Sequence, residues 1–205
     1  MFFTSRYLVA LLAMISFSIS AQSKDGSHIQ PDNFYPKVKI ETDLGNMTVE
    51  LDRRRAPITV NNFLRYVEKG SYDNTVFHRI IPGFVVQGGG YDAEFNTLPA
   101  FGQIYNESGN GLKNDMYTVA MARGDDPHSA NRQFFFNVQD NRSLNPGRNW
   151  GYTVFGLVLE GAEVVDKLAE VETAYNMELG WRDVPVENVM LKKVTLLPEP
   201  VVAGQ

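Results

Sequence analysis

The feature that most constrains this sequence is a series of eight short segments rich in β-branched and aromatic residues, each bounded by turn-forming residues. Such segments are typical of β-strands, because branched and aromatic side chains pack well on a pleated surface. They lie at residues 37–42, 47–52, 75–80, 84–88, 117–122, 133–138, 152–158 and 188–197. We therefore expect a mainly β protein whose first two strands form a hairpin around residues 43–46.

Two other segments show helical spacing of apolar residues, at 57–70 and 161–171. The recurring positions are Val60, Phe63, Leu64 and Val67 in the first segment and Val164, Val165, Leu168 and Val171 in the second. Pro57 and Gly70 are a typical start and stop for the first helix. Eight strands and two helices without βαβ alternation predict a closed eight-stranded antiparallel barrel capped by two α-helices.

The chain is expected to hold one folded domain, at residues 37–197. Its 205 residues with 43% hydrophobic content suffice for one sizeable core. The polar, proline-containing segments 22–36 and 198–205 are expected to be flexible. Residues 89–115 are rich in Gly, Asn and Asp without periodicity, which favours a functional loop.

The N-terminal residues 1–21 have the pattern of a secretory signal peptide. Arg6 is their only charge, the apolar run 8–19 is shorter than the roughly 20 residues of a spanning helix, and small residues precede a cleavage site near Ala21. A single membrane anchor is the alternative. Cysteine is absent, so neither a disulfide nor a lipid-bearing thiol can form. We expect an exported, monomeric chain without stable membrane association.

Charge and histidine placement exclude several function classes. A formal net charge of −5 argues against nucleic acid as a partner, and the run Arg53–Arg55 reads as a solvated turn. The three histidines, His28, His78 and His128, are far apart, so we expect no metal site and no cofactor. The sequons at Asn46, Asn106 and Asn141 would matter only in a eukaryotic secretory route.

Arg79 and Gln87 stand out as polar residues in otherwise apolar strands. Adjacent strands could bring them together, and a guanidinium beside an apolar surface needs an acceptor such as the Gln carbonyl. From the pattern alone, an Arg that merely closes the end of a barrel remains open.

Four blocks of the sequence resemble a known family. FHRIIPGFVVQGGG (77–90), MARG (121–124), NRQFFFNV (131–138) and YTVFGLVLEGAEVVDKL (152–168) are similar, in the same order, to the signature blocks of the cyclophilin peptidyl-prolyl cis-trans isomerases. MAR and GYTVFG resemble the exported bacterial branch, which points to the bacterial periplasm. The match covers about residues 37–197.

The resemblance implies a barrel with two capping helices and a groove for proline-containing, unfolded or partly folded polypeptides. It implies that the enzyme accelerates rotation of X-Pro bonds during the folding of exported proteins, with Arg79 as the catalytic residue and Gln87 orienting it. The residues implied to bind substrate are Phe84, Val85, Phe135, Leu144 and Tyr152 at the proline pocket and Ala122, Arg123 and Gln133 along the peptide backbone.

The sequence departs from the family pattern at three positions of this groove. Val85 stands where Met is frequent, Tyr152 where His is frequent, and Ser143 where many members have Trp. The loss of that Trp predicts weak binding of the inhibitor cyclosporin, while Trp150 in the same loop is expected to be buried. Two alternatives are a noncatalytic prolyl-peptide binder and a lipocalin-type carrier, which would need an open interior.

Overall fold

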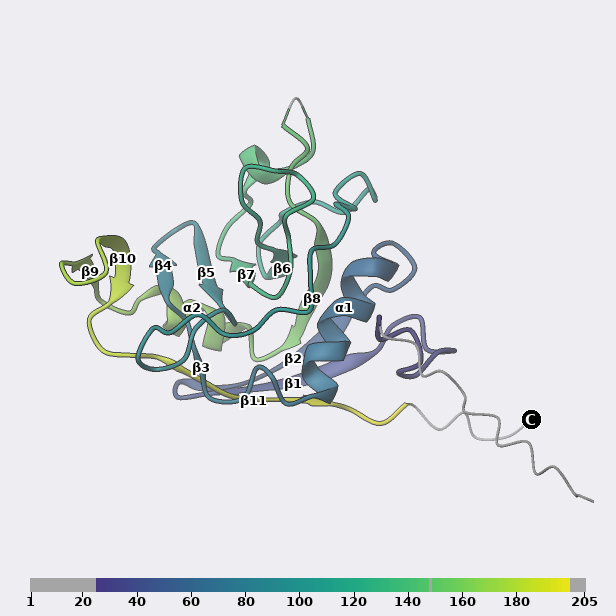
Figure 1. Ribbon diagram of the computed structural model, residues 1–205, viewed down its shortest axis with the longest axis horizontal. Helices are drawn as coiled ribbons and strands as arrows, with labels where there is room; N and C mark the ends of the chain where they lie inside the picture. The colour runs from purple at the N-terminus through teal and green to yellow at the C-terminus, as the bar shows by residue number, and fades with distance from the viewer. Residues whose placement is uncertain (1–24, 148, 200–205) are drawn as a thin grey trace, which may run out of the picture.

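The computed structural model describes residues 25–147 and 149–199, and all structural statements refer to these ranges. Figure 1 shows a strongly curled sheet with α1 and α2 packed against it. The elements are β1 Lys37–Thr42, β2 Gly45–Leu51, α1 Pro57–Glu68, β3 Thr75–Val76, β4 Arg79–Ile81, β5 Val85–Gly88, β6 Thr118–Met121, β7 Phe134–Asn137, the 3₁₀ helix η1 Arg142–Leu144, β8 Val154–Glu160, α2 Ala162–Ala169, β9 Thr173–Asn176, β10 Trp181–Pro185 and β11 Met190–Leu196. The expected signal peptide, residues 1–21, and most of the tail 198–205 lie outside the described residues.

The main sheet has nine strands in the order β3-β11-β1-β2-β8-β6-β7-β5-β4, so the prediction of a closed eight-stranded barrel is wrong. The predicted strand 75–80 is split into β3 and β4, which occupy opposite edges of the sheet although only Phe77 and His78 separate them. The N–H of Phe77 donates to the carbonyl of Val189, which pairs this residue away from β5. The sheet therefore curls around its core without a closing ladder between β3 and β4.

A second, two-stranded sheet of β9 and β10 was not predicted from the sequence. It lies beside β4, at the left of Figure 1. Its strands are short and only partly buried, and β10 contains two charged residues and a proline, which hide the alternation that marks a strand.

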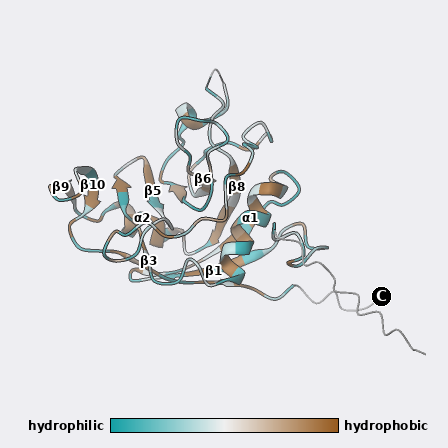
Figure 2. Ribbon diagram, viewed as in Figure 1, coloured by the Kyte–Doolittle hydropathy of each residue, from teal (hydrophilic) through white to brown (hydrophobic). Residues whose placement is uncertain are grey.

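Both predicted helices are present. In α1 the predicted apolar face is buried, and Figure 2 shows hydrophobic and hydrophilic residues alternating along this helix. Its N-terminus is capped from the long loop 89–115, because the carboxylate of Glu107 accepts hydrogen bonds from the backbone N–H groups of Ile58 and Thr59. In α2 Val164, Val165 and Leu168 are buried as predicted, and the helix ends before Val171.

The interior of the curled sheet is filled by aromatic side chains. The ring of Phe63 on α1 lies 5.0 Å from Tyr72, 5.5 Å from Phe134 and 5.3 Å from Phe155, measured between centroids. These four side chains are almost completely buried. A filled core of this kind argues against a carrier with an open interior.

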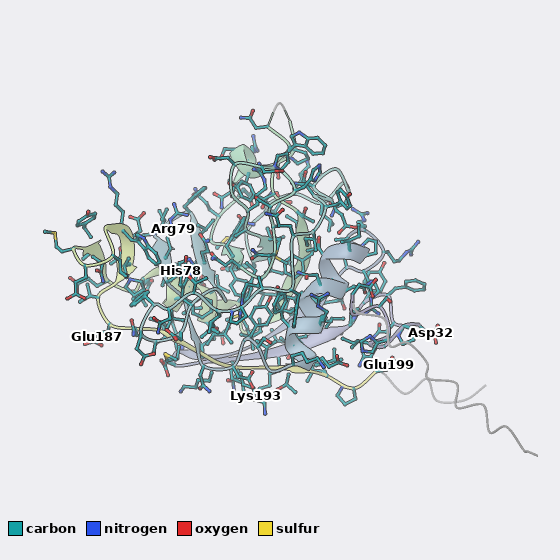
Figure 3. The ribbon with its side chains drawn as sticks, in the orientation of Figure 1. Asp32, His78, Arg79, Glu187, Lys193 and Glu199 are labelled. Carbon is teal, nitrogen blue, oxygen red and sulfur yellow. The ribbon has the colours of Figure 1, made fainter. Side chains whose placement is uncertain are left out.

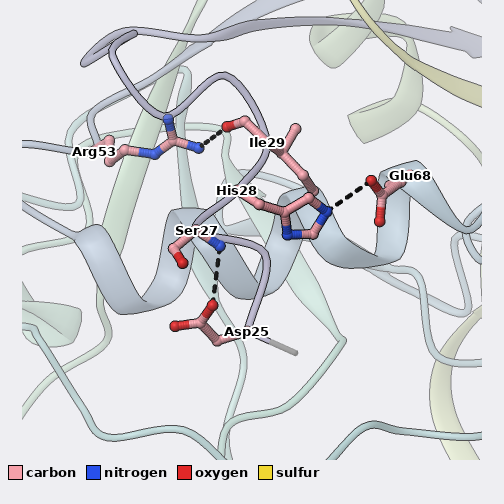
Figure 4. A network of polar contacts seen from close by, with 6 residues as sticks. All are labelled: Asp25, Ser27, His28, Ile29, Arg53 and Glu68. Carbon is pink, nitrogen blue, oxygen red and sulfur yellow. Dashed lines mark hydrogen bonds and ion pairs between the residues drawn. The ribbon is translucent and has the colours of Figure 1, made fainter. Parts of the chain in front are cut away.

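Arg53 differs from the expected solvated turn, and residues 25–36, whose flexibility stays a prediction, lie over it. Residues 25–36 form successive turns, and Arg53 is only 7% exposed beneath them. Its guanidinium donates to the carbonyls of Ile29 and Asn33, at 2.7 and 2.9 Å, and to that of Gln30. Figure 4 shows the hydrogen bond from Arg53 to the carbonyl of Ile29 together with the His28–Glu68 contact, which measures 2.9 Å. A buried arginine thus ties the N-terminal segment to the sheet.

A second buried arginine holds the long loop 89–115. Arg132 is 3% exposed and donates to the carbonyls of Gly89 at 2.7 Å, Pro99 at 2.8 Å and Ser71 at 2.5 Å. This loop contains no helix or named strand, so side-chain donors replace the missing backbone ladder. In the described residues no helix is both long and apolar enough to cross a membrane.

Candidate functional site

One pocket collects all but one of the residues that the sequence marked as a site. Its volume is about 110 Å³, small beside the roughly 300–1,000 Å³ of pockets for drug-sized ligands. The residues lining it are Arg79, Phe84, Val85, Gln87, Ala122, Arg123, Phe135, Leu144 and Tyr152. The remaining residue, Gln133, lines an adjoining hollow of about 250 Å³ together with Gln87, Ala122 and Arg123.

The floor of the pocket is an apolar cluster separate from the main core. Val85 of β5 and Phe135 of β7 are each 3% exposed, and Tyr152 packs edge-on against Phe135 with 5.6 Å between ring centroids. Phe84 and Leu144 are only partly buried and complete the walls. An apolar surface of this size, left open on one side, suits a single small ring.

Arg79 and Gln87 meet as the strand pattern suggested. They are direct partners in the β4–β5 ladder, and Nη1 of Arg79 donates to Oε1 of Gln87 at 3.3 Å. Nε2 of Gln87 in turn donates to Oε1 of Gln133 at 2.9 Å. The first bond is longer than usual, and the Arg79 side chain is 41% exposed. Gln87, itself held by Gln133, therefore orients the guanidinium and leaves most of its N–H donors without a hydrogen bond to these amides.

Arg123 is engaged more fully than the sequence suggested. Its guanidinium donates to the carbonyls of Asn149 and Gly151, both at 3.0 Å, and to that of Gly124 at 2.8 Å. It also lies 4.7 Å above the ring of Tyr152. These contacts hold the loop that carries Tyr152 in place. Arg123 therefore has a structural role in addition to any contact with a peptide backbone.

Beneath the walls lies a network of buried asparagines that sequence reasoning missed. Asn141 donates to the carbonyl of Phe84 and to Oδ1 of Asn137, both at 2.8 Å. Asn137 donates to Oδ1 of Asn114 at 3.2 Å, and Asn114 donates to the carbonyl of Leu144 at 3.1 Å. The network joins two walls of the pocket from below. Asn141 is 3% exposed, so this sequon offers little access for a glycan.

Two of the glycines after Gln87 allow neighbouring side chains to lie close to the backbone. Gly89 has φ +82, and a Cβ there would lie 2.9 Å from the rings of Phe134 and Tyr72. At Gly90 a Cβ would lie 2.5 Å from Nε2 of Gln133, the residue that receives the Gln87 hydrogen bond. The glycine run therefore serves side-chain packing next to the pocket.

The rim near Ser143 contains an exposed tryptophan, so the prediction that Trp150 is buried is wrong. Trp150 is 53% exposed, has φ +61 and packs edge-on against His128 at 5.1 Å. It lines a hollow of about 640 Å³ together with Ser143, Leu144 and Tyr152. Weak cyclosporin binding stays a prediction.

His78, next to Arg79, faces the other way and is 5% exposed. Its ring lies 4.6 Å from that of Tyr91 and 6.3 Å from that of Trp181. Burial, with a smaller contribution from the charge of Arg79, lowers the pKa of His78 to about 4. Figure 3 shows His78 and Arg79 together at β4. The imidazole is therefore neutral at physiological pH.

Potential metal ligands are not gathered at the pocket. Within residues 25–147 and 149–199, no group of three or more His, Cys, Asp or Glu side chains could hold a metal ion. The polar groups that line the pocket are two guanidinium groups, the amide of Gln87 and the hydroxyl of Tyr152. These groups can donate hydrogen bonds, and the guanidinium groups carry positive charge. The residues that line the pocket include no Ser, Thr, Cys or Lys nucleophile.

The comparisons with known proteins agree with this geometry. Residues 37–196 match the family model described as cyclophilin type peptidyl-prolyl cis-trans isomerase. A peptidyl-prolyl cis-trans isomerase of Streptomyces antibioticus is 47% identical over 78% of this chain and 98% of its own. Peptidyl-prolyl cis-trans isomerase A of Dickeya dadantii is 37% identical over 93% of this chain and 95% of its own.

Solved structures show the same relationship. The crystal structure of a cyclophilin type peptidyl-prolyl cis-trans isomerase of Cryptosporidium parvum has a TM-score of 0.66 and 25% identity, covering 82% of this chain and all of that one. The same protein was also solved in the presence of the dipeptide Ala-Pro. Fold, pocket and sequence comparisons together support peptidyl-prolyl cis-trans isomerase activity, and this chain belongs to the cyclophilin-type peptidyl-prolyl cis-trans isomerase family.

Proposed function

We propose that this protein accelerates rotation about X-Pro bonds of exported polypeptides, with Arg79 as the catalytic residue. The observation that carries the proposal is a half-exposed guanidinium at the edge of a small apolar pocket, aimed by Gln87. The pocket would hold the pyrrolidine ring while the preceding peptide group turns beside Arg79. The residues proposed to bind the substrate are Phe84, Val85, Ala122, Arg123, Gln133, Phe135, Leu144 and Tyr152.

The reaction requires no bond to be made or broken. Resonance keeps the amide planar and sets a barrier of roughly 18–20 kcal/mol, so uncatalysed exchange takes about 10–100 s. In the twisted amide the prolyl nitrogen regains a lone pair, which can accept a hydrogen bond from Arg79. Donation to that nitrogen stabilises the twisted amide more than the planar one, and each ~1.4 kcal/mol of this difference gives a tenfold rate increase.

The remaining residues have supporting roles in this proposal. Gln87 limits the rotation of the guanidinium, and its own amide is held by Gln133. Val85, Phe135 and the ring of Tyr152 fix the proline by shape rather than by charge. Tyr152, at the position where His is frequent in the family, keeps an aromatic wall and is itself held under Arg123.

We further propose that the protein is exported, and this proposal depends on the sequence of residues 1–21 alone. A single charged residue, a short apolar run and small residues before Ala21 support a cleaved signal peptide and a periplasmic location. The substrates would then be unfolded or partly folded exported polypeptides containing proline, and the mature protein would be a monomer. Determining the N-terminal residue of the protein recovered from its native host tests this part.

The activity itself is tested by measuring cis-to-trans exchange of an Ala-Pro peptide with and without the protein. We expect exchange to accelerate in proportion to protein concentration. Binding of the peptide without acceleration would instead support a noncatalytic prolyl-peptide binder built on the same fold. In that case Arg79→Ala would bind the peptide as the parent does.

A further inference from the structure

A second side chain faces the guanidinium of Arg79, from an element outside the main sheet. Oδ2 of Asp183 lies 3.9 Å from Nε of Arg79, and the two side chains are 40% and 41% exposed. Gln87 contacts a different nitrogen, Nη1. Among the described residues no hydrogen bond is made by Nη2, so that nitrogen remains for a substrate.

Asp183 is brought to this place by the β9–β10 hairpin, which is seated firmly beside β4. The ring of Trp181 on β10 lies 5.0 Å from that of Tyr91 and 6.3 Å from each of the rings of His78 and Phe95. Val184, on the other side of Asp183, is only 3% exposed. Because Trp181 packs against three rings outside the hairpin and Val184 is buried, packing determines where the hairpin places the carboxylate of Asp183.

The backbone at Asp183 is unusual in a way that directs its side chain. Asp183 has φ +61, and the pairing of β10 with β9 shifts register between Trp181 and Val184. Bulges of this kind re-aim a side chain, and they recur next to active sites. Asp and Asn adopt this backbone conformation more readily than most residues do.

We propose that Asp183 is a positioning residue for Arg79 and that the β9–β10 hairpin carries it to the groove. The proposal rests on the function proposed above for Arg79. In the empty groove the half-exposed pair contributes little, since water screens it. A bound peptide excludes water and strengthens the attraction, so the guanidinium is held most firmly while the amide turns. Removing the carboxylate should therefore lower kcat and leave KM unchanged.

The substitution Asp183→Asn tests this with little disturbance of the fold. Asn has the same shape and tolerates positive φ, so only the charge is lost. The matched control is Glu178→Gln, which removes one exposed carboxylate from the same hairpin. Thermal unfolding of both variants should match that of the parent, which shows that the hairpin remains seated.

Two readouts distinguish positioning from a structural role. In Ala-Pro exchange we expect Asp183→Asn to lose about threefold in kcat with KM unchanged, while Glu178→Gln behaves as the parent. The ¹⁵N resonance of Arg79 Nε should move in Asp183→Asn and not in Glu178→Gln. Parent-like kcat in Asp183→Asn, an equal loss in both variants, or an unmoved Nε resonance would overturn the proposal.

Arg79→Ala, assayed in parallel, separates this inference from the proposed function. If Arg79→Ala loses activity and Asp183→Asn does not, only the positioning role is wrong. If Arg79→Ala retains the activity of the parent, the catalytic role of Arg79 fails, and the role of Asp183 fails with it.

Discussion

Arg132 and Arg79 lie in two regions of the same fold and use the same side chain in opposite ways. Arg132 is buried under the loop 89–115, and all three of its guanidinium nitrogens donate to backbone carbonyls. Arg79 stands at the edge of an apolar pocket, 41% exposed, with one long hydrogen bond to Gln87. An arginine whose three guanidinium nitrogens all donate within the protein contributes to stability, whereas one with nitrogens to spare can act on a substrate.

The largest expected effect is on stability and concerns the buried Arg132. Arg132→Met removes three charge-assisted hydrogen bonds, each contributing roughly 1.5–3 kcal/mol, so the free energy of unfolding should fall by about 4 kcal/mol or more. Chemical denaturation measures this, with the exposed Arg54→Met as the control expected to stay within about 0.5 kcal/mol of the parent. A loss below about 1 kcal/mol for Arg132→Met would break the comparison.

His78 precedes Arg79 in the sequence but is buried, so its titration tests how sharply burial changes between these two neighbours. Its folded pKa of about 4 lies below its ordinary 6.5, so the unfolded chain binds a proton more readily. The contribution of neutral His78 to the free energy of unfolding should be fully present above pH 6.5. The free energy of unfolding should fall by up to about 3 kcal/mol as the pH drops from 6.5 to 4, and this loss should level off below pH 4.

The control for this pH dependence is His78→Phe, which keeps an aromatic ring against Tyr91 and Trp181. We expect the variant to lack this contribution between pH 6.5 and 4, as measured by denaturation at several pH values. The same pH dependence in parent and variant would show that His78 is not the group responsible.

A middle case is Asn137, which is fully buried and supports the pocket walls without touching Arg79. Asn137→Ala removes hydrogen bonds to Asn114, Thr118 and Asn141. We expect a loss of about 2 kcal/mol in stability and a raised KM with a nearly unchanged kcat, because the walls bind substrate whereas Arg79 acts on the twisted amide. A lower kcat at constant KM would contradict this division.

At the rim, the expected effect is smaller and concerns an inhibitor. Ser143 lacks the area and the donor of a tryptophan, so cyclosporin should bind at least tenfold more weakly than to members with Trp there, a difference of about 1.4 kcal/mol. Titration of the inhibitor against activity, in the parent and in Ser143→Trp, measures it. Trp150→Ala is the informative companion, since Trp150 lines the same hollow. A parent that already binds tightly and gains nothing from Ser143→Trp would refute the prediction.

The sequence predicted those parts of the fold and site that have a local signature. Spacing located both helices, and strand alternation brought Arg79 and Gln87 together. The resemblance gathered the pocket residues, which no local pattern marks. The split of strand 75–80 was missed because Phe77 and His78 look like strand residues, while the backbone N–H of Phe77 donates to Val189, more than a hundred residues away.

Residues whose roles depend on distant partners were missed for the same reason. Arg53 looks like part of a solvated turn, and its burial follows only from the turns at residues 25–36. Asn137 and Asn141 resemble ordinary loop residues until the fold places Asn114 beside them. Asp183 sits in a hairpin that has no clear strand pattern.

The most direct test of the account is Arg79→Ala measured for both activity and stability. An arginine with unused donors should lose at least about a hundredfold in kcat/KM for Ala-Pro exchange, as is typical when a preorganised donor is removed, and change the free energy of unfolding by less than about 0.5 kcal/mol. Activity within twofold of the parent, or a loss of stability as large as that of Arg132→Met, would contradict the account.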